Sequence, residues 1–459
     1  MLKESQTDLD HEGSRASPPA ADLDPAAGAA ARSRKAAGFP SMAWTAQAAL
    51  LASAAFGCGG SAPGPAPAAD GVEVPVLPAE GYVRLAFNES PFGPPPCVVP
   101  AMEEMLARPC AMEAPDPDFL PGINRYPDFL NVEATDQAAR RHGISSRHVV
   151  VCCGISELIS MCAKAYLGAG KHLLTPEACY LLPAHCAGRR GCPVRTAPMD
   201  GTHGIDLDAL LAQTNADTGL IYLANPNNPT GSLLAFEDLE AFVKLAAGKS
   251  PEAVVLVDEA YMDYVLEQPL PEAVRLVKNH RVLVGRTFSK AFGLAGLRAG
   301  YAVGHEDLVL DLNGFLSGYL GGDPGWRMFE GNLNRLGVAA MVASLSDEGL
   351  AFLDSVRTRN AALRGRLAGG LLDLGYDPLP SHASFLLVSV NSDGENLRRH
   401  LCANRILVQA GASFHPGYRD RVRISVGSED EIEALLTALK SYDPSRTYPS
   451  CFPVFYHGI

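Results

Sequence analysis

The sequence predicts an α/β fold with a parallel, doubly wound sheet between about residue 81 and residue 442. Residues 148–151, 220–223, 253–257 and 281–284 form short β-branched runs. These runs are apolar throughout instead of alternating, which is typical of strands buried on both faces. Segments of helical periodicity, such as residues 157–166 and 236–247, lie between them. Strands and helices that alternate at this spacing indicate a mostly parallel sheet covered by helices on both sides.

The bulk composition agrees with a folded, enzyme-sized protein. Of 459 residues, 47% are hydrophobic and 19% are charged, which is enough apolar material for a large core and excludes a disordered chain. The chain has 38 Lys and Arg against 51 Asp and Glu, and its net charge of −13 argues against a nucleic-acid partner. The 11 cysteines include no C-x-x-C pair, so neither a disulfide scaffold nor a zinc ribbon is indicated and no metal site is expected.

Residues 1–80 differ from the rest of the chain and are predicted to be a disordered leader outside the fold, rich in Ala, Pro, Gly and Ser. A basic cluster at residues 32–35, an apolar stretch at 42–56 and a Gly/Pro/Ala linker follow one another in the order of an export signal. Gly57-Cys58 resembles a lipoprotein cleavage site, and residues 33–39 resemble a twin-arginine motif with lysine as its second base. Export with a possible lipid anchor at Cys58 and a cytoplasmic location stay equally open, since a functionless low-complexity leader or an over-extended start site would have the same composition. No other stretch is long enough to span a membrane.

Unusual polar residues follow four of the predicted strands. In parallel sheets, ligands gather beyond the carboxyl ends of the strands, so these residues are expected to converge on one site. Together they supply a carboxylate, an amide, a phenol, a lysine and a helix N-terminus. The four segments are Cys153-Gly154-Ile155-Ser156-Glu157, Asn225-Pro-Asn-Asn228-Pro-Thr-Gly231, Asp258-Glu-Ala-Tyr261 and Arg286-Thr287-Phe-Ser289-Lys290.

These groups match the chemistry of one cofactor. A lysine at the end of a buried strand, Lys290, is placed to form a Schiff base with an aldehyde. The helix N-terminus at Gly154 and Ser156 suits a phosphate, and Ser289 and Arg298 could complete the anion site. A buried carboxylate such as Asp258 suits a protonated ring nitrogen. An aldehyde, a phosphate and a pyridinium together describe pyridoxal 5′-phosphate.

Each of these signals is weak by itself. A lone aspartate after a strand is more often a helix cap, a lone lysine in a loop is nearly always solvated, and NPNNPTG also fits a simple turn. Their common order and spacing carries the prediction: 30 residues separate Asn228 from Asp258, and 32 separate Asp258 from Lys290.

From about residue 85 to residue 427 the chain resembles the class I/II aminotransferases of fold type I, and among them most closely the histidinol-phosphate aminotransferases. The resemblance implies a large, doubly wound sheet domain that binds pyridoxal phosphate and a smaller α+β domain. It divides this chain into an N-terminal arm with part of the small domain at 81–120, a large domain at 121–335, the C-terminal small domain at 336–442 and a surface tail at 443–459. The motifs that carry it are Asn88-Glu-Ser-Pro-Phe92-Gly-Pro, Asn124-Arg-Tyr126-Pro-Asp, the strand-end segments above, the continuation of Lys290 to Arg298-Ala-Gly-Tyr301, and Arg423-Ile-Ser-Val-Gly427.

Specific roles follow from this resemblance. Lys290 would hold the cofactor and then shuttle a proton, Asp258 would pair with the pyridinium nitrogen, and Asn228 and Tyr261 would hydrogen-bond the phenolate oxygen. Arg423 would clamp the substrate carboxylate, with Asn88 and Phe92 near the substrate. An amino donor and a 2-oxo acid would be the substrates, and a homodimer the minimal active unit. The phosphate would be held by Gly154, Ile155, Ser156, Ser289 and Arg298, with Tyr126 reaching it from a second subunit. Thr287 would also contact the cofactor.

Three departures from the family pattern bear on specificity. Ala178 stands where an aromatic residue usually stacks on the cofactor ring, so either Tyr180 supplies the ring or that face is covered differently. Gln409 stands where histidinol-phosphate enzymes often carry arginine, and Phe92 where tyrosine is common. Because lost polar contacts to a phosphate are costly in a desolvated site, these departures count against histidinol phosphate as the substrate.

The sequence is therefore predicted to encode a pyridoxal-phosphate-dependent aminotransferase that moves an amino group between an amino acid or related amine and a 2-oxo acid. A decarboxylase, lyase or cyclase of the same fold, similar to threonine-phosphate decarboxylase, remains open because these enzymes share nearly all the motifs. A non-catalytic cofactor-binding regulator is a remote alternative, since residues 1–80 show no helix-turn-helix pattern.

Overall fold

The computed structural model describes residues 81–108, 122–125, 128–316 and 333–449. The chain divides into two units, residues 1–73 and 74–459, and all described residues belong to the second. The predicted leader, with Cys58, therefore lies outside the described residues. Among the described helices, no single one is long and apolar enough to cross a membrane, although a bent pair, Arg335–Ser344 with Asp347–Asp373, passes that test when taken together.

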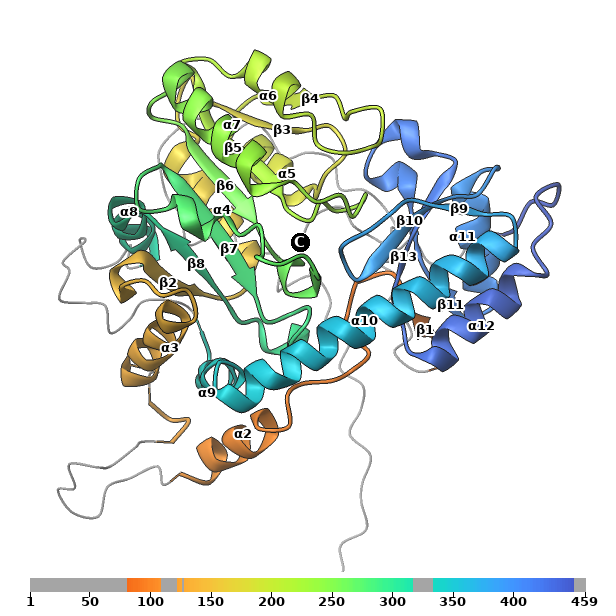
Figure 1. Ribbon diagram of the computed structural model, residues 1–459, viewed down its shortest axis with the longest axis horizontal. Coiled ribbons are helices and arrows are strands. Elements are labelled where there is room, and N and C mark those ends of the chain that lie inside the picture. The colour runs from red at the N-terminus through yellow and green to blue at the C-terminus, as the bar shows by residue number, and fades with distance from the viewer. Residues whose placement is uncertain (1–80, 109–121, 126–127, 317–332, 450–459) are drawn as a thin grey trace, which may run out of the picture. The chain divides into compact units, whose positions relative to one another are not determined.

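A seven-stranded sheet lies at the centre of the larger part of the fold (Figure 1). Its strands are parallel except β8, which runs antiparallel to both of its neighbours. This confirms the predicted mostly parallel sheet, and each of the four predicted runs is a strand within one to three residues of its predicted ends. In spatial order the strands are β2 (Val149–Cys152), β8 (Gly300–Gly304), β7 (Val282–Thr287), β6 (Val254–Asp258), β5 (Thr218–Ala224), β3 (His172–Pro176) and β4 (Val194–Ala197).

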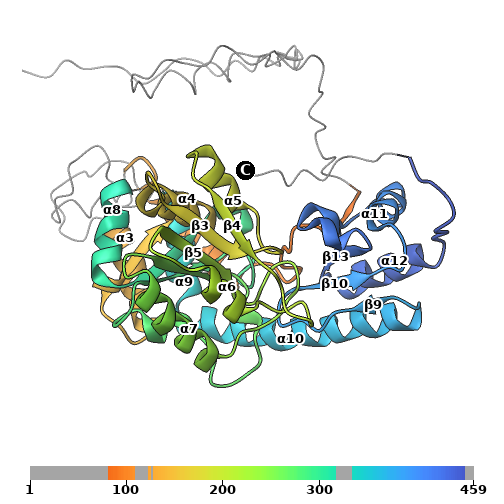
Figure 2. The same ribbon diagram turned by 90° about the horizontal axis from the view of Figure 1, so that it is seen from above.

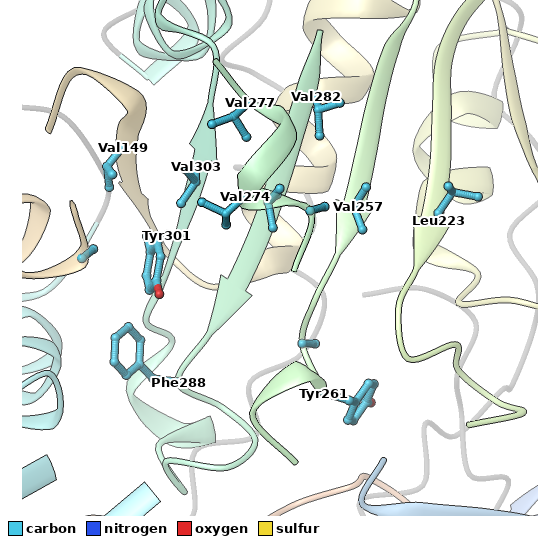
Figure 3. Close-up of a cluster of buried hydrophobic side chains, with 14 of the residues drawn as sticks. Val149, Leu223, Val257, Tyr261, Val274, Val277, Val282, Phe288, Tyr301 and Val303 are labelled. Carbon is cyan, nitrogen blue, oxygen red and sulfur yellow. The ribbon is translucent and has the colours of Figure 1, made fainter. Parts of the chain in front are cut away.

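Alternate residues of these strands enter two separate cores, one on each face of the sheet. Leu223, Val257 and Val303 face one core, as Figure 3 shows. Their neighbours Tyr222 and Leu256 face the other. The continuous apolar runs are explained by this double burial.

Helices cover both faces, as expected for a doubly wound sheet (Figure 2). The predicted helices at 157–166 and 236–247 are confirmed as α4 and α7. The first core is closed by α3 (Asp128–Arg141), α6 (Leu207–Gln213), α7 (Phe236–Lys249) and α9 (Arg335–Ser344), with α2 (Val98–Ala107) packed against α9. The second core is closed by α4 (Ile155–Tyr166), α5 (Leu182–Arg189) and α8 (Glu306–Leu316).

A smaller α/β part follows α10 (Asp347–Asp373). Its four-stranded antiparallel sheet has the order β12 (Gln409–Ala410), β13 (Arg421–Ser425), β10 (Phe385–Ser389) and β9 (Asp377–Pro378). With α11 (Gly394–Ala403) and α12 (Glu429–Leu439), it encloses a third core. The N-terminal strand β1 (Val83–Arg84) pairs in parallel with β11 (Ile406–Leu407), so the chain enters the fold attached to this part.

The chain after α12 lies against α11. Tyr448 is buried, and its ring meets that of His400 edge to face, with 4.6 Å between their centroids. Asn396 on the same helix donates a hydrogen bond to the carbonyl of Arg446 at 2.8 Å and accepts one from the Tyr448 amide at 3.1 Å. Residues 446–448 are thus held on the smaller part of the fold by a ring contact and by hydrogen bonds between their backbone and the Asn396 side chain.

Candidate active site

A cavity of about 500 Å³ opens where the carboxyl ends of the central strands meet β13 and the segment after β1. Two walls can be distinguished. The substrate wall comprises Phe87, Asn88, Phe414 and Arg423. The cofactor wall comprises Ile155, Ser156, Asn228, Asp258, Tyr261, Thr287, Ser289, Lys290 and Arg298, all of which the sequence predicted as site residues.

An anion cradle forms one end of the cofactor wall. The helix α4 begins there, and its first amide groups have no carbonyl partner within the helix. Gly154 caps this helix with φ of +75°, and a Cβ atom at this position would lie 2.9 Å from Arg298 Nη2. Arg298 in turn donates a hydrogen bond to Ser289 Oγ at 3.2 Å. Glycine is therefore required by both the backbone conformation and the close guanidinium, and the cradle combines a helix N-terminus, a hydroxyl and a cation.

Lys290 lines the cavity. Its Nζ donates a hydrogen bond to the carbonyl of Phe87 at 2.9 Å. Burial, and after it the positive charge of Arg423, lower the pKa of Lys290 from 10.5 to about 8. At pH 7 about a tenth of this amine is consequently in the uncharged form that a nucleophile or a base requires.

Asp258 is the buried carboxylate of the site, with only 5% of its surface exposed. Its Oδ1 accepts a hydrogen bond from the Ala260 amide at 3.0 Å, and its Oδ2 accepts one from the Tyr222 hydroxyl at 2.8 Å. Burial raises the pKa of Asp258 to about 6, while these two donors and the nearby Lys290 oppose the rise. The carboxylate thus remains mainly ionised at neutral pH despite its burial.

Tyr261 and Asn228 are oriented by residues of the substrate wall. Asn88 Nδ2 donates to the Tyr261 hydroxyl at 2.9 Å, and Arg423 Nη1 donates to Asn228 Oδ1 at 2.7 Å. Asn88 is itself held by Ser425. The Ser425 Oγ accepts a hydrogen bond from the backbone N–H of Asn88 at 2.9 Å and donates one to Asn88 Oδ1 at 2.8 Å. The predicted phenolate-binding pair is therefore supported from the smaller part of the fold.

Arg423 supplies the cation of the substrate wall. It is 4% exposed and lies on β13, where it also donates to the carbonyl of Ala86. Its guanidinium carbon lies 4.9 Å from the centre of the Phe414 ring and 5.4 Å from that of Phe385. Such a desolvated, planar donor group is suited to bind a carboxylate with two hydrogen bonds.

The structure separates the three departures from the family pattern. Ala178 is fully buried and does not line the cavity, whereas Tyr180 does, which favours Tyr180 as the residue that supplies the ring. Gln409 pairs with Arg423 across β12 and β13, is 2% exposed, and donates from Nε2 to Ser413 Oγ at 2.7 Å. Gln409 thus adjoins the substrate wall without reaching the cavity of the single chain.

The predicted contact between Phe92 and the substrate stays a prediction. Phe92 does not line the cavity, because its ring packs against the first core and beneath the guanidinium of Arg359, whose carbon lies 4.3 Å from the ring centre. Tyr126 lies outside the described residues, so its predicted role stays a prediction. Gly154 acts as the helix cap beside the cavity.

Several lining residues were not found from the sequence. Tyr222 and Phe87 each precede a recognised motif by one or three residues, and Cys153 opens the helix-start segment. Phe414 belongs to none of the quoted motifs. Ser425 does not line the cavity but holds Asn88, and it lies within a quoted motif without a predicted role. A signal existed for Tyr222 alone: strand alternation places it on the same face as Ala224, which directly precedes the Asn225 motif.

A family model described as "Aminotransferase class I and II" matches residues 80–439 of the chain. The chain belongs to this family. Among similar curated proteins, histidinol-phosphate aminotransferase 2 of Methylococcus capsulatus is 31% identical over 366 residues, which cover 78% of this chain and 89% of that protein. Histidinol-phosphate aminotransferase 1 of Thiobacillus denitrificans is 32% identical over 361 residues, which cover 78% and 84%.

Solved structures of aminotransferases share the fold. Histidinol-phosphate aminotransferase from Sinorhizobium meliloti, solved in complex with pyridoxal 5′-phosphate, is 27% identical with a TM-score of 0.66, covering 78% of this chain and 89% of that one. A putative histidinol-phosphate aminotransferase from Erwinia carotovora atroseptica is 26% identical with a TM-score of 0.67, covering 78% and 95%. The predicted fold type I, the pyridoxal-phosphate cofactor and the aminotransferase function are thereby confirmed.

The residues present in this aminotransferase fit pyridoxal phosphate. The anion cradle at Gly154 suits its phosphate, and the buried Asp258 suits its ring nitrogen. When bound, the cofactor supplies an electron-withdrawing ring that stabilises negative charge at the substrate α-carbon. Lys290 would attach it through Nζ, and its partly neutral amine would serve as the base that carries the α-proton. Arg423 would orient the substrate through its anionic group, and the rings of Phe87 and Phe414 would exclude water beside it.

Proposed function

We propose that this aminotransferase takes an α-amino acid or related amine with one anionic group and an otherwise apolar structure, and passes its amino group to a 2-oxo acid. The observation that carries the proposal is the charge of the cavity lining. Its basic side chains are Lys290, Arg298 and Arg423. Lys290 and Arg298 belong to the cofactor wall, so the described chain leaves Arg423 to bind the substrate's charge. Phe87 and Phe414 beside Arg423 favour apolar or aromatic groups.

The same observation argues against histidinol phosphate, the substrate named for the similar proteins, as the preferred donor. A phosphate monoester carries close to two negative charges and three acceptor oxygens at neutral pH, and it is bound best by more than one cation. Here Gln409, next to Arg423 on the neighbouring strand, contributes an uncharged amide that already donates to Ser413. Desolvating a dianion against a single guanidinium is less favourable than desolvating a carboxylate.

The proposal is tested with a panel of amino donors added singly to the pyridoxal-phosphate enzyme without an acceptor. Conversion of the cofactor to pyridoxamine phosphate, followed by absorbance and chromatography, reports the first half-reaction. Phenylalanine, tyrosine and leucine are expected to convert the enzyme with a higher kcat/KM than histidinol phosphate or aspartate. A preference for histidinol phosphate would overturn the substrate class. Release of carbon dioxide without pyridoxamine phosphate would indicate the lyase alternative instead.

We propose, in addition, that the active unit is a homodimer. Support comes from the resemblance, which places Tyr126 in the partner's site, and from Val99 and Leu106 of α2 and Val132 of α3, which are about half exposed. Light scattering should give twice the chain mass. Mixing Lys290→Ala with Tyr126→Ala should restore activity, since one of the two sites in a mixed dimer then has both residues. A monomeric, fully active protein would refute this proposal.

We also propose that the leader directs export. The support is the signal-like order of residues 32–58 together with one structural observation: Cys402 on α11 is disulfide-bonded. Structural disulfides form and persist mainly in oxidising compartments. Peptide mapping of protein alkylated before lysis should recover Cys402 in a disulfide-linked peptide, and mature protein should lack residues 1–57. A free Cys402 thiol and an intact leader in the soluble fraction would contradict export.

A further inference from the structure

Tyr222 is a buried residue of the cavity that none of the family motifs includes. It is 0% exposed and lies on β5, two residues before the end of that strand. Its phenol oxygen lies 2.8 Å from Asp258 Oδ2. In the parallel ladder, Ala224 of β5 is the register partner of Asp258 at the end of β6. Tyr222 shares a face of β5 with Ala224, and this placement brings its phenol to the carboxylate.

The direction of this hydrogen bond is fixed by the ionisation of the two groups. Burial and the neighbouring Asp258 raise the pKa of Tyr222 well above its ordinary value, so it remains a protonated phenol. An ionised carboxylate has no proton to give and only accepts. Tyr222 is therefore the donor, and the Ala260 amide holds the other oxygen at 3.0 Å. Each carboxylate oxygen of Asp258 has one fixed donor.

The remaining groups near Asp258 do not replace this donor. The positive charge of Lys290 favours the ionised form of Asp258. Cys179 lies close enough to sense its charge, but burial raises the pKa of that thiol to about 12, so it stays neutral. Among the described side chains that act on Asp258, Tyr222 is the one that donates a hydrogen bond to it.

We propose that Tyr222 is a positioning residue that orients Asp258 and keeps it ionised, so that the proton shared with the cofactor's ring nitrogen rests on the nitrogen. A proton between two basic atoms resides on the more basic one. A donor to the carboxylate lowers its basicity, and a buried donor does so more strongly than one in water. The electron-withdrawing power of the ring depends on a protonated nitrogen, so Tyr222 acts on the reaction through Asp258. This inference rests on the cofactor of the family and not on the substrate class proposed above.

The test removes the hydroxyl group of Tyr222. Tyr222→Phe keeps the ring in its core position and removes only the donor. The variant is loaded with pyridoxal phosphate labelled with an NMR-active nitrogen in the ring, and the shift of that nitrogen is followed against pH. The nitrogen is expected to lose its proton at a lower pH than in the unaltered enzyme. Affinity of the cofactor-free protein for pyridoxal phosphate is expected to fall by about tenfold, since hydrogen bonds to charged groups are strong.

A second variant should shift the protonation of the ring nitrogen in the opposite direction. A ring-fluorinated tyrosine incorporated at position 222 keeps the hydroxyl and the shape but is a more acidic phenol, and hence a stronger donor. The ring nitrogen should then keep its proton to a higher pH than in the unaltered enzyme. The two substitutions should therefore move the same resonance in opposite directions. A purely structural role would not produce this reversal.

Tyr301→Phe is the matched control. Tyr301 lies on β8 of the same sheet, is 1% exposed, and its hydroxyl is hydrogen-bonded to His142 Nε2 at 2.9 Å, but it does not line the cavity. This variant should leave the nitrogen resonance and the cofactor affinity unchanged. The proposal is overturned if Tyr222→Phe folds with unaltered nitrogen protonation, or if Tyr301→Phe shifts it equally. It is also overturned if Tyr222→Phe has its full effect on nitrogen protonation in an Asp258→Asn background, where no carboxylate remains to be tuned.

Discussion

The cofactor wall and the substrate wall of the cavity are built in different ways. Most of the cofactor wall comes from the ends of neighbouring strands of one sheet, so backbone hydrogen bonds between β5, β6 and β7 fix its spacing. The substrate wall joins residues 87–88 to β13, and its linking hydrogen bonds connect Asn88 with Ser425, 337 positions apart. The first wall has a local, rigid frame, whereas the second depends on the assembly of distant segments. The chemistry is therefore set by the sheet, and the substrate by the segments brought against it.

The two walls also differ in electrostatics. The cofactor wall combines a carboxylate with two cations, whereas the substrate wall has the single guanidinium of Arg423 between aromatic rings. They are nevertheless coupled, because Arg423 lowers the pKa of Lys290 and donates to Asn228. Changes in the first wall should abolish the reaction, and changes in the second should redirect it. The predictions below test this division.

The largest effect is expected from removing the lysine of the cofactor wall. Lys290→Ala deletes both the covalent attachment point and the base, so kcat is expected to fall by about 10⁴-fold or more. Borohydride treatment of the loaded enzyme should attach the cofactor to Lys290 in the unaltered protein and to no residue in the variant, as read by mass spectrometry. Lys164→Ala, on the exposed side of α4, is the control and should retain activity. Substantial turnover by Lys290→Ala would remove the lysine from the mechanism.

The next effect is expected from altering the cation of the substrate wall. Arg423→Lys keeps the charge but loses the planar pair of donors, and it also weakens the hold on Asn228. We expect kcat/KM for the amino acid to fall by about 10²-fold, mainly through KM, because a charge pair in a desolvated site is disrupted. Affinity for pyridoxal phosphate, measured by titration of the cofactor-free protein, should change little. An equal loss in cofactor affinity would mean that the two walls cannot be separated.

The coupling between the walls is open to a pH measurement. Only the neutral amine of Lys290 attacks an aldehyde, and its pKa is lowered to about 8. The rate at which pyridoxal phosphate adds to the cofactor-free protein should therefore rise with pH, by about a hundredfold between about pH 6 and a plateau above pH 8. Arg423→Gln removes a positive charge that opposes the ammonium form, so the midpoint should move to higher pH. A midpoint that does not move would show that Arg423 does not contribute to the lowered pKa of Lys290.

The same contrast explains what the sequence could predict. Asp258 and Lys290 stand in short contiguous motifs at strand ends, where local pattern and sheet topology together place a side chain. The face of Tyr222 follows from strand alternation, but its hydrogen bond to Asp258 depends on the register of β5 against β6, which no local pattern encodes. The hydrogen bond between Asn88 and Ser425 depends on the packing of two segments far apart in the sequence, so no local pattern predicts it either.

Two features of the structure were not anticipated from the sequence, for physical reasons. Phe92 follows Asn88 by only four residues, yet its backbone turns away so that the ring enters the first core. The antiparallel direction of β8 could not be read from the sequence, because Gly300–Gly304 is buried on both faces like its parallel neighbours. Burial pattern reports that a strand is central and says nothing about its direction.

The smallest effect, and the one that most directly tests the difference between the walls, is expected from adding a cation. Gln409→Arg places a second guanidinium opposite Arg423 across β12 and β13. Like charges on opposed strand positions are unfavourable, and this site is buried, so the melting temperature should fall. A dianionic substrate would offset that repulsion, and the ratio of kcat/KM for histidinol phosphate to that for phenylalanine should rise by about tenfold.

Gln409→Met is the matched control, because it preserves length and removes the amide without adding charge. It should lower stability slightly and leave the substrate ratio unchanged. If both variants shift the ratio alike, the gain arises from repacking and not from charge. If Gln409→Arg leaves the ratio unaltered while the protein stays folded, position 409 does not control the substrate's charge, and the specificity assigned to the substrate wall must lie with Phe87 and Phe414.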